Sequence, residues 1–269
     1  MRAAHMKSTV FLGGGRITGA LISGLRLAAY EQPIIVHDRH AAKMRQLRRQ
    51  FGVRGEPGLQ PAVAQARLLI VAVRPDSIRQ LLGEIGGGGR PLLAVSLAAG
   101  VPLAKLRKGL GPPVRWARAM PSPTCRSGRG FTALAFSREL SLSDRKRVRD
   151  FFARVGSVLE IPEQKFDAFT ATYSSSHGYH ALAALSRAGE KLGLNSKAAL
   201  AAAAHALAGG VMAFTEGKLP LEKLIHEAAT PGGIAATVMK TMDDAGYYRI
   251  IERGVRAGVA RARANARRV

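Results

Sequence analysis

The chain has 269 residues, 47% of them hydrophobic, which is enough for two domains with ordinary cores. Its formal net charge is +23, from 41 Lys and Arg against 18 Asp and Glu. The single cysteine, Cys125, excludes an internal disulfide framework and fits a reducing cytoplasm. The absence of Cys and His clusters argues against a structural zinc site, so we expect no metal.

The positive charge raises nucleic acid as a partner, but its distribution does not favour one. The Lys and Arg residues are spread along the chain, and the aromatic residues, only 6%, are not interleaved with them. A stacking platform for bases is therefore not indicated, and we do not expect a nucleic-acid partner. The same positive field would attract an anionic cofactor or a carboxylate substrate.

Neither a membrane span nor a secretory signal is predicted. We expect no apolar run of the ~18 residues that a membrane-spanning helix needs. The first six residues, MRAAHM, contain no long apolar core, and Met6 is an alternative start. We therefore expect a cytoplasmic protein without a membrane partner.

The first predicted elements are a strand, a glycine turn and a helix. An apolar, β-rich run at 7–12 precedes three glycines, and apolar residues then recur at helical spacing over 17–25. This order opens a dinucleotide-binding βαβ unit of the Rossmann type. Gly13 permits the sharp turn, Gly15 lets the backbone approach a pyrophosphate, and the helix N-terminus presents N–H groups to that anion. Thr18 stands in place of the usual third glycine, and a simple loop is the alternative interpretation.

The second predicted strand, at 33–36, is followed by an acidic and a basic residue. Asp38 lies about 20 residues past the turn, where a carboxylate would bind a ribose hydroxyl. Asp38 could instead cap the helix that begins near Ala41. Arg39 could pair with a 2′-phosphate, so the cofactor is either NAD or NADP.

Strands and helices then alternate to about residue 160, which predicts a doubly wound α/β sheet. The strand at 68–73 ends at Arg74 and Pro75, at the edge where such sheets bind ligands. The strand at 92–97 is followed by small residues, beginning with Ala98, that leave room for a ring. The remaining expected helices are 41–51, 62–66, 77–85 and 103–110. A short strand is expected to start at 52–53, and further strands at 114–118 and 131–136, with a flexible break at 86–89.

Beyond Phe166 the chain is predicted to be helical, because Ala, Leu and Gly dominate and β-branched runs are absent. We therefore divide the chain into a dinucleotide-binding domain at 1–160 and an all-α domain at 161–269. So small a helical half would not bury its apolar faces alone, which predicts packing against a second copy, as a homodimer or higher homo-oligomer. The expected helices are 166–192 with a break near 174–178, 197–216, 221–228, 234–245 and 247–268.

Six short motifs, in matching order and spacing, resemble the pyrroline-5-carboxylate reductase family along nearly the whole chain. The glycine turn FLGGGRITGALISGL resembles that family's cofactor turn. The other five are VAVRP at 71–75, SLAAG at 96–100, RAMPSPT at 118–124, SGRGFTAL at 127–134 and TPGGIA at 230–235. Six motifs together are far more specific than one glycine turn, so the resemblance covers both predicted domains.

That family reduces a small cyclic imine carboxylate, 1-pyrroline-5-carboxylate, to L-proline with NADPH or NADH, and its helical half forms intertwined dimers. The resemblance implies that turn residues hold the pyrophosphate, namely Leu12, Gly13, Gly14, Gly15, Arg16 and Ile17. It implies that Ala72, Val73, Arg74 and Pro75 line the ribose and the nicotinamide edge, with Ala98 against the ring.

The turn at 230–233 is the candidate substrate site. It directly precedes a helix, so its N–H groups suit a carboxylate, although helix punctuation is the alternative. By the resemblance, the substrate carboxylate is held by Thr230, Gly232, Gly233, Ile234 and Ala235. The catalytic candidates in this loop are Thr230, Ala235 and Thr237. No strong general acid is evident in the sequence; Glu216 and Glu227 lie near the turn, with surface solvation as the alternative interpretation.

Departures from the family pattern cluster on the substrate side. The family threonine that bonds the imine nitrogen is Ala235 here, and Thr237 lies two residues further on. The segment at 173–179 lacks the glycines and the proline of the family's "sGSGPAY". Its His177 is either an interior histidine or a substrate contact. Losing a hydroxyl that bonds the substrate can cost orders of magnitude in discrimination.

Three functions therefore remain open. The first is reduction of 1-pyrroline-5-carboxylate. The second is a related oxidoreductase acting on a different imine or an oxo acid, suggested by Ala235 and the altered 173–179 segment. The third is a non-catalytic nucleotide-binding or nucleic-acid-binding protein, suggested by the charge and the lost hydroxyl.

Overall fold

The computed structural model describes residues 8–86 and 89–269. The chain divides into two compact units. The first runs to Thr172 and also takes in Ala257–Val269, and the second is Tyr173–Arg256. The expectations placed on residues 1–7, including the alternative start, and part of the predicted break at 86–89 lie outside the described residues.

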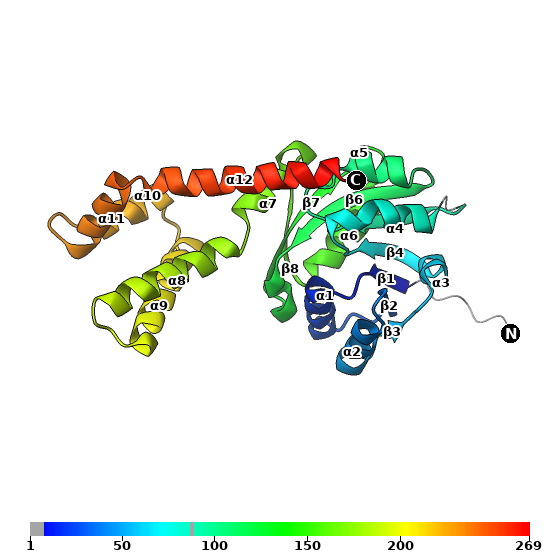
Figure 1. The fold of residues 1–269 in the computed structure, drawn as a ribbon, viewed down its shortest axis with the longest axis horizontal. Helices are drawn as coiled ribbons and strands as arrows, with labels where there is room; N and C mark the ends of the chain where they lie inside the picture. The colour runs from blue at the N-terminus through cyan, green and yellow to red at the C-terminus, as the bar shows by residue number, and fades with distance from the viewer. Residues whose placement is uncertain (1–7, 87–88) are drawn as a thin grey trace. The chain divides into compact units, whose positions relative to one another are not determined.

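An eight-stranded sheet forms the centre of the first unit (Figure 1). Its strand order is β3-β2-β1-β4-β5-β6-β7-β8, and β6–β7 is its one antiparallel pair. Because β1 pairs with both β2 and β4, the winding direction reverses there, and dinucleotides bind doubly wound sheets at the carboxyl side of that point. The strands are β1 (Ser8–Leu12), β2 (Ile34–His37), β3 (Arg54–Gly55), β4 (Ala66–Val71), β5 (Leu92–Ser96), β6 (Val114–Pro121), β7 (Gly130–Phe136) and β8 (Gly156–Glu160).

Helices cover both faces of this sheet and complete two hydrophobic cores. Val10 and Phe11, neighbours on β1, are fully buried and belong to different cores, as expected of a strand covered on both sides. The predicted α/β class with a doubly wound N-terminal sheet is confirmed. One core includes α1 (Arg16–Leu27), α2 (Ala41–Phe51) and α6 (Leu142–Ala153); the other includes α3 (Leu59–Ala64), α4 (Ile78–Ile85) and α5 (Leu103–Gly109).

Helix α1 lies very close to a short 3₁₀ turn, η2 (Pro123–Ser127). A β-carbon built on Gly24 would clash with the carbonyl oxygen of Cys125 and lie 3.0 Å from Cγ1 of Val155. Cys125 is itself fully buried in the core. The missing side chain at Gly24 therefore lets the helix approach the backbone of η2.

Several element boundaries differ from the prediction. Strand β4 begins and ends two residues before the predicted 68–73, because the chain leaves the sheet at Ala72 beside the glycine turn. Strand β3 begins after Val53, since Gly52 ends α2 in a left-handed conformation (φ 64°). The short helix expected at 62–66 begins earlier, at Leu59, and ends before β4.

Two elements were not predicted, α6 and β8. Helix α6 is capped by Ser141, whose Oγ accepts a hydrogen bond from the backbone N–H of Asp144 at 3.1 Å. The helix is rich in charged residues and buries only a short apolar stripe that ends in Phe151 and Phe152, which weakens its sequence pattern. Strand β8 lies at the sheet edge beside β7 and is largely exposed, so its composition is not that of a buried strand.

The helical prediction for the rest of the chain is confirmed in the described residues. The expected break after Phe166 falls between α7 (Phe166–Thr172), in the first unit, and α8 (Ser176–Lys191). Asn195 caps the next helix, since its Oδ1 accepts a hydrogen bond from the N–H of Ala198 at 2.9 Å. The other helices are α9 (Ser196–Glu216), α10 (Leu221–Ala228), α11 (Ile234–Asp244) and α12 (Tyr247–Arg267).

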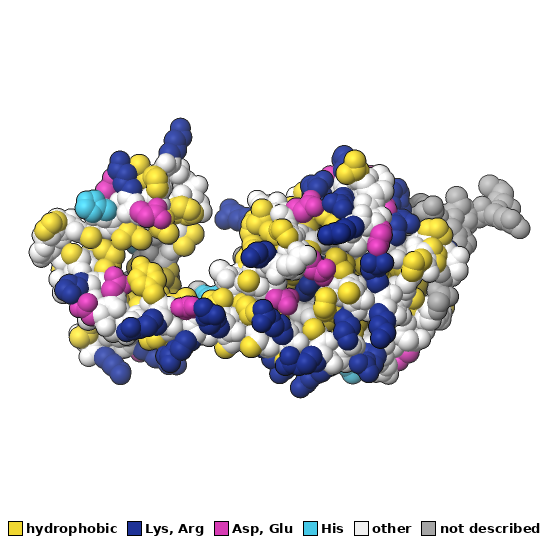
Figure 2. All heavy atoms as spheres, turned by 90° about the horizontal axis from the view of Figure 1, so that it is seen from above, with side chains coloured by type: hydrophobic (Ala, Val, Ile, Leu, Met, Phe, Trp, Pro, Cys, Tyr) yellow, Lys and Arg dark blue, Asp and Glu magenta, His cyan; other side chains and the backbone are white. Residues whose placement is uncertain are grey.

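The second unit exposes many large apolar side chains, visible as yellow spheres in Figure 2. In this unit the buried residues are Ser186, Ala199, Ala203 and Gly246, all of them small. Bulky apolar residues such as Ile234 are exposed. Exposed apolar surface of this kind marks an interaction surface. The exposed set includes Tyr179, Leu192, Leu200, Val211, Met212, Phe214, Ile225, Ile234, Val238, Tyr248 and Ile250.

Helix α9 corrects the expectation that no apolar run reaches membrane-spanning length. By length and composition it could cross a membrane, the one helix in the described ranges that passes this test. Residues 198–215 carry no acidic residue, lysine or arginine, and nine of these 18 residues are alanine. Apolar helices that pack against protein share this length and composition.

The last residues of the chain return to the first unit. A β-carbon on Gly100 would clash with the backbone of Ala262, and Gly100 has a positive φ of 78° that favours glycine. The Asn265 amide donates a hydrogen bond to the carbonyl oxygen of Ala99 at 3.3 Å. The end of α12 is thereby joined to the loop that follows β5.

Candidate functional site

The glycine turn forms the carboxyl end of β1. Gly13 has a φ of 103°, and a β-carbon there would lie 2.5 Å from the carbonyl oxygen of Ala72. Its N–H donates to the carbonyl oxygen of His37 at 2.8 Å, which ties the turn to the end of β2. Gly13 must therefore be glycine both for its backbone conformation and for lack of space.

Thr18 explains why the third glycine of the usual pattern can be absent. Its side chain is fully buried, and its hydroxyl donates a 2.6 Å hydrogen bond to the carbonyl oxygen of Gly13. The next residue, Gly19, would place a β-carbon 3.6 Å from Leu47, an ordinary contact. The hydroxyl at position 18 thus holds the turn that the glycines shape.

The N-terminus of α1 is free to receive an anion. Gly15 is its N-cap, with no side-chain cap and no acidic residue in the first turn. A β-carbon on Gly15 would meet nothing within 4 Å, so there is open space over the turn. Ile17 is half-buried and Arg16 is exposed, while Leu12 is buried in the strand. A pyrophosphate fits such a cradle, where N–H groups and the helix dipole favour negative charge.

Asp38 is held against this turn. Its Oδ2 accepts a hydrogen bond from the N–H of Gly14 at 2.7 Å, and its Oδ1 accepts one from the N–H of His40 at 2.8 Å. The N-cap of α2 is His40, so Asp38 does not occupy the cap position at that helix. Burial tends to raise the pKa of Asp38, but these two bonds and the Lys43 ammonium outweigh it and lower the pKa below its ordinary value.

Arg39 points elsewhere. Its Nη2 lies 3.0 Å from Glu84 Oε1, and its Nη1 donates to Gln80 Oε1 at 3.2 Å. Both partners belong to α4. The guanidinium is therefore engaged by α4, on the side of the sheet opposite to α2.

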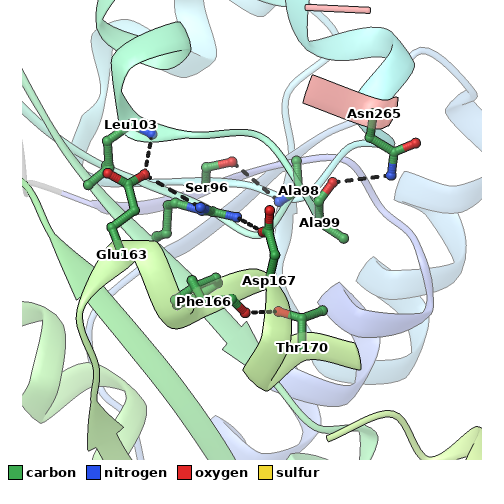
Figure 3. Close-up of polar contacts among 10 residues, drawn as sticks. Ser96, Ala98, Ala99, Leu103, Glu163, Phe166, Asp167, Thr170 and Asn265 are labelled. Carbon is green, nitrogen blue, oxygen red and sulfur yellow. Dashed lines mark hydrogen bonds and ion pairs between the residues drawn. The ribbon is translucent and has the colours of Figure 1, made fainter. Parts of the chain in front are cut away.

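The remaining cofactor candidates follow β4 and β5. Ala72, Val73 and Pro75 are half-buried and Arg74 is exposed, directly after β4. Ala98 is buried, and its N–H donates to Oγ of Ser96 at 3.3 Å (Figure 3). The ends of β1, β2, β4 and β5 thus bring the predicted dinucleotide residues to one edge of the sheet.

A buried ionic cluster beside this edge was not anticipated. Arg118 on β6 is 2% exposed; its guanidinium lies 3.4 Å from Glu163, 3.1 Å from Asp167 and over the ring of Phe166. Glu163 also accepts a hydrogen bond from the N–H of Leu103 at 2.6 Å (Figure 3). The cluster therefore joins β6, α5 and the start of α7. Arg118, one of two arginines in the otherwise largely apolar strand β6, was the sequence signal that could have indicated a buried charge here.

The substrate candidates lie in the second unit. Gly232 has a φ of 75°, Gly233 is the N-cap of α11, and Thr230, Ile234 and Ala235 are exposed. The Thr230 carbonyl accepts a hydrogen bond from the N–H of Gly233 at 2.9 Å, which closes the turn. The Thr237 hydroxyl donates to the carbonyl oxygen of Gly233 at 3.1 Å, within its own helix. The turn precedes a helix as predicted, and its role stays a prediction.

Two hollows, of about 340 and 400 Å³, lie at the opposite, amino edge of the sheet. Both are lined by Arg67 and Arg147, and neither is lined by a candidate cofactor residue. Figure 2 shows Lys and Arg side chains distributed over the face that it draws. Within the described chain, no group of three or more His, Cys, Asp or Glu side chains is placed to hold a metal ion.

The strand order of the sheet, the glycine turn after β1 and the residues at the carboxyl edge together define a dinucleotide-binding oxidoreductase. Residues 8–100 match the family described as NADP oxidoreductase, coenzyme F420-dependent. Residues 163–265 match the family described as pyrroline-5-carboxylate reductase dimerisation.

Similar proteins extend this match over the whole chain. A pyrroline-5-carboxylate reductase of Thermus thermophilus is 32% identical, covering 92% of this chain and 96% of the relative. One of Corynebacterium melassecola is 30% identical, covering 91% and 94%. The Plasmodium falciparum pyrroline carboxylate reductase with NADP bound shares the fold, with a TM-score of 0.85 at 20% identity over 98% of this chain and 100% of that one. This chain belongs to the pyrroline-5-carboxylate reductase family.

Proposed function

We propose that this protein reduces 1-pyrroline-5-carboxylate to L-proline with NADPH or NADH. The observation that carries the proposal is the glycine turn at the winding reversal of the sheet. It occurs in a chain that matches the Thermus enzyme over 92% of its length.

The residues at the carboxyl edge fit a nicotinamide dinucleotide. The open space over Gly15 and the uncapped start of α1 suit the pyrophosphate, and residues 72–75 with Ala98 suit the ribose and the ring. The bound cofactor would supply the hydride. The role of this chain is then to hold the cofactor and the imine together, since a protonated imine is already electrophilic and placement can supply much of the rate.

The turn before α11 is the proposed carboxylate site. Gly232 and Gly233 place no side chains over the turn, and the start of an eleven-residue helix favours an anion there. We propose residues 161–269 as the substrate-binding and dimerisation domain, active as a homodimer or higher homo-oligomer. The exposed apolar side chains of the second unit support such an assembly. We propose a cytoplasmic location, which the lone, buried Cys125 supports.

The test is an assay of the full chain with 1-pyrroline-5-carboxylate, following the loss of reduced-nicotinamide absorbance. Gly13→Ala should abolish turnover, because its β-carbon would clash with Ala72. Gly52→Ala is the matched control: it also has a positive φ, of 64°, but open space around it, so it should keep the activity. Absence of turnover with both nicotinamides would refute the proposal.

A second candidate is reduction of a different imine or an oxo acid. The turn before α11 favours this candidate, because Ala235 has no hydroxyl and the Thr237 hydroxyl donates to the carbonyl oxygen of Gly233. Ala235→Thr should raise kcat/KM for 1-pyrroline-5-carboxylate if that imine is the substrate, whereas Ala236→Thr, one position along the same helix, should not. A substrate panel in which another imine or an oxo acid is preferred by the unaltered protein would establish the second candidate.

A further inference from the structure

We propose that this enzyme prefers NADH to NADPH, because Asp38 fixes a negative charge beside the adenosine ribose and Glu84 draws Arg39 away from it. This inference rests on the proposed function, since it takes the dinucleotide to lie along the carboxyl edge. It assigns the discrimination to two carboxylates, that of Asp38 in the loop between β2 and α2 and that of Glu84 on α4.

The Asp38 carboxylate is held in place by backbone. Its side chain is 9% exposed, and each oxygen accepts one backbone N–H, from Gly14 and from His40. Although burial opposes ionisation, these bonds keep the pKa of Asp38 low, so the group is charged at neutral pH. An ionised carboxylate can accept a hydrogen bond from a ribose 2′-hydroxyl, whereas a 2′-phosphate brings like charge and no matching donor.

Lys43 does not reverse this balance. Its Nζ lies 3.4 Å from Asp38 Oδ2, and its side chain is 44% exposed. The ammonium is therefore already compensated by a carboxylate that the backbone keeps in position. A 2′-phosphate would have to compete with Asp38 for that cation.

Arg39 is the residue that would otherwise bind a 2′-phosphate. Its two terminal nitrogens are engaged by Glu84 and Gln80, and the Gln80 amide also donates to Glu84 at 2.8 Å, which steadies the acceptor. The Arg39–Glu84 pair is half-exposed, so it reduces the attraction of Arg39 for phosphate without abolishing it.

The experiment is titration calorimetry of the full chain with ADP-ribose and with 2′-phospho-ADP-ribose, which differ only in the 2′-phosphate. The unaltered protein should bind ADP-ribose tighter by about tenfold or more. Asp38→Asn keeps a hydrogen-bond acceptor but removes the charge, so it should reduce this ratio by about tenfold. Glu84→Gln should reduce the ratio in the same direction by freeing Arg39. Asp150→Asn, an exposed aspartate of α6 at the amino edge, makes the same change in net charge and should leave the ratio unaltered.

Equal or tighter binding of the phosphorylated ligand by the unaltered protein would overturn the preference. So would an unchanged ratio in Asp38→Asn. If neither ligand binds, the cofactor site and this inference both fail. If ADP-ribose binds with the expected ratio but no imine is reduced, the proposed reaction fails and the preference stands.

Discussion

The hydroxyl of Thr18 gives a sharp test of how the glycine turn is held. In Thr18→Val the side chain keeps its shape, but the carbonyl of Gly13 loses the donor that reaches it at 2.6 Å. Because Thr18 and Gly13 are both buried, water cannot replace that donor. A buried acceptor left unpaired costs about 1–3 kcal/mol, so we expect the free energy of unfolding to fall by that amount.

The loss should also weaken cofactor binding, since the turn carries the pyrophosphate cradle. Thr18→Ser is the matched control: it keeps the hydroxyl and removes one methyl group, at a cost of about 1 kcal/mol. Urea unfolding gives the stability of both variants, and calorimetry with ADP-ribose gives their affinity. We expect Thr18→Val to lose affinity and Thr18→Ser to retain it. If Thr18→Val matches the unaltered protein in both measurements, the hydroxyl does not hold the turn.

Three other variants or conditions test the rest of the first unit. Gly24→Ala should lower the unfolding free energy by about 2–3 kcal/mol by forcing α1 off Cys125, whereas Gly83→Ala, in open space on α4, should not; equal effects would refute the close approach. The Cys125 thiol, whose pKa burial raises to about 11, should resist a thiol reagent in the native protein and react on unfolding; rapid native labelling would contradict its burial. The pKa of Asp38 lies below its ordinary 3.8 in the folded protein, so its stabilising effect is complete above that value and is lost as pH falls through the folded pKa. The stability difference between the unaltered protein and Asp38→Asn should therefore shrink as the pH falls below about 4; a difference that grows on acidification would contradict the assigned direction.

The buried strands and long helices were predictable because their patterns are local. Strand β5 ends one residue before its predicted end, and α2 and α10 match their predicted bounds. In each case, apolar spacing and flanking turn residues are read from neighbouring positions in the chain. Helix α6 was missed although Ser141 and Asp144 form a recognisable cap, because few of its residues are apolar.

The candidate site was predictable only in part, because its contacts join distant residues. Gly13 and Asp38 follow from spacing alone, but the bond from Thr18 to Gly13 and the engagement of Arg39 by Glu84 do not. Arg118 meets acids 45 and 49 positions further along the chain, and no periodicity links them. Such pairings arise from the folded backbone, so a single sequence does not show which distant residues will pair.

The last turns of α12 have a consequence for how the protein is made. Residues 257–269 belong to the first unit, and they contact the loop at 99–100 that begins just past Ala98. During synthesis, the ribosome must therefore translate the whole second unit before the first can be completed. A fragment that stops at Thr172 would leave that loop without its covering helix, so a separately produced nucleotide-binding half should be engineered with the final helix grafted back.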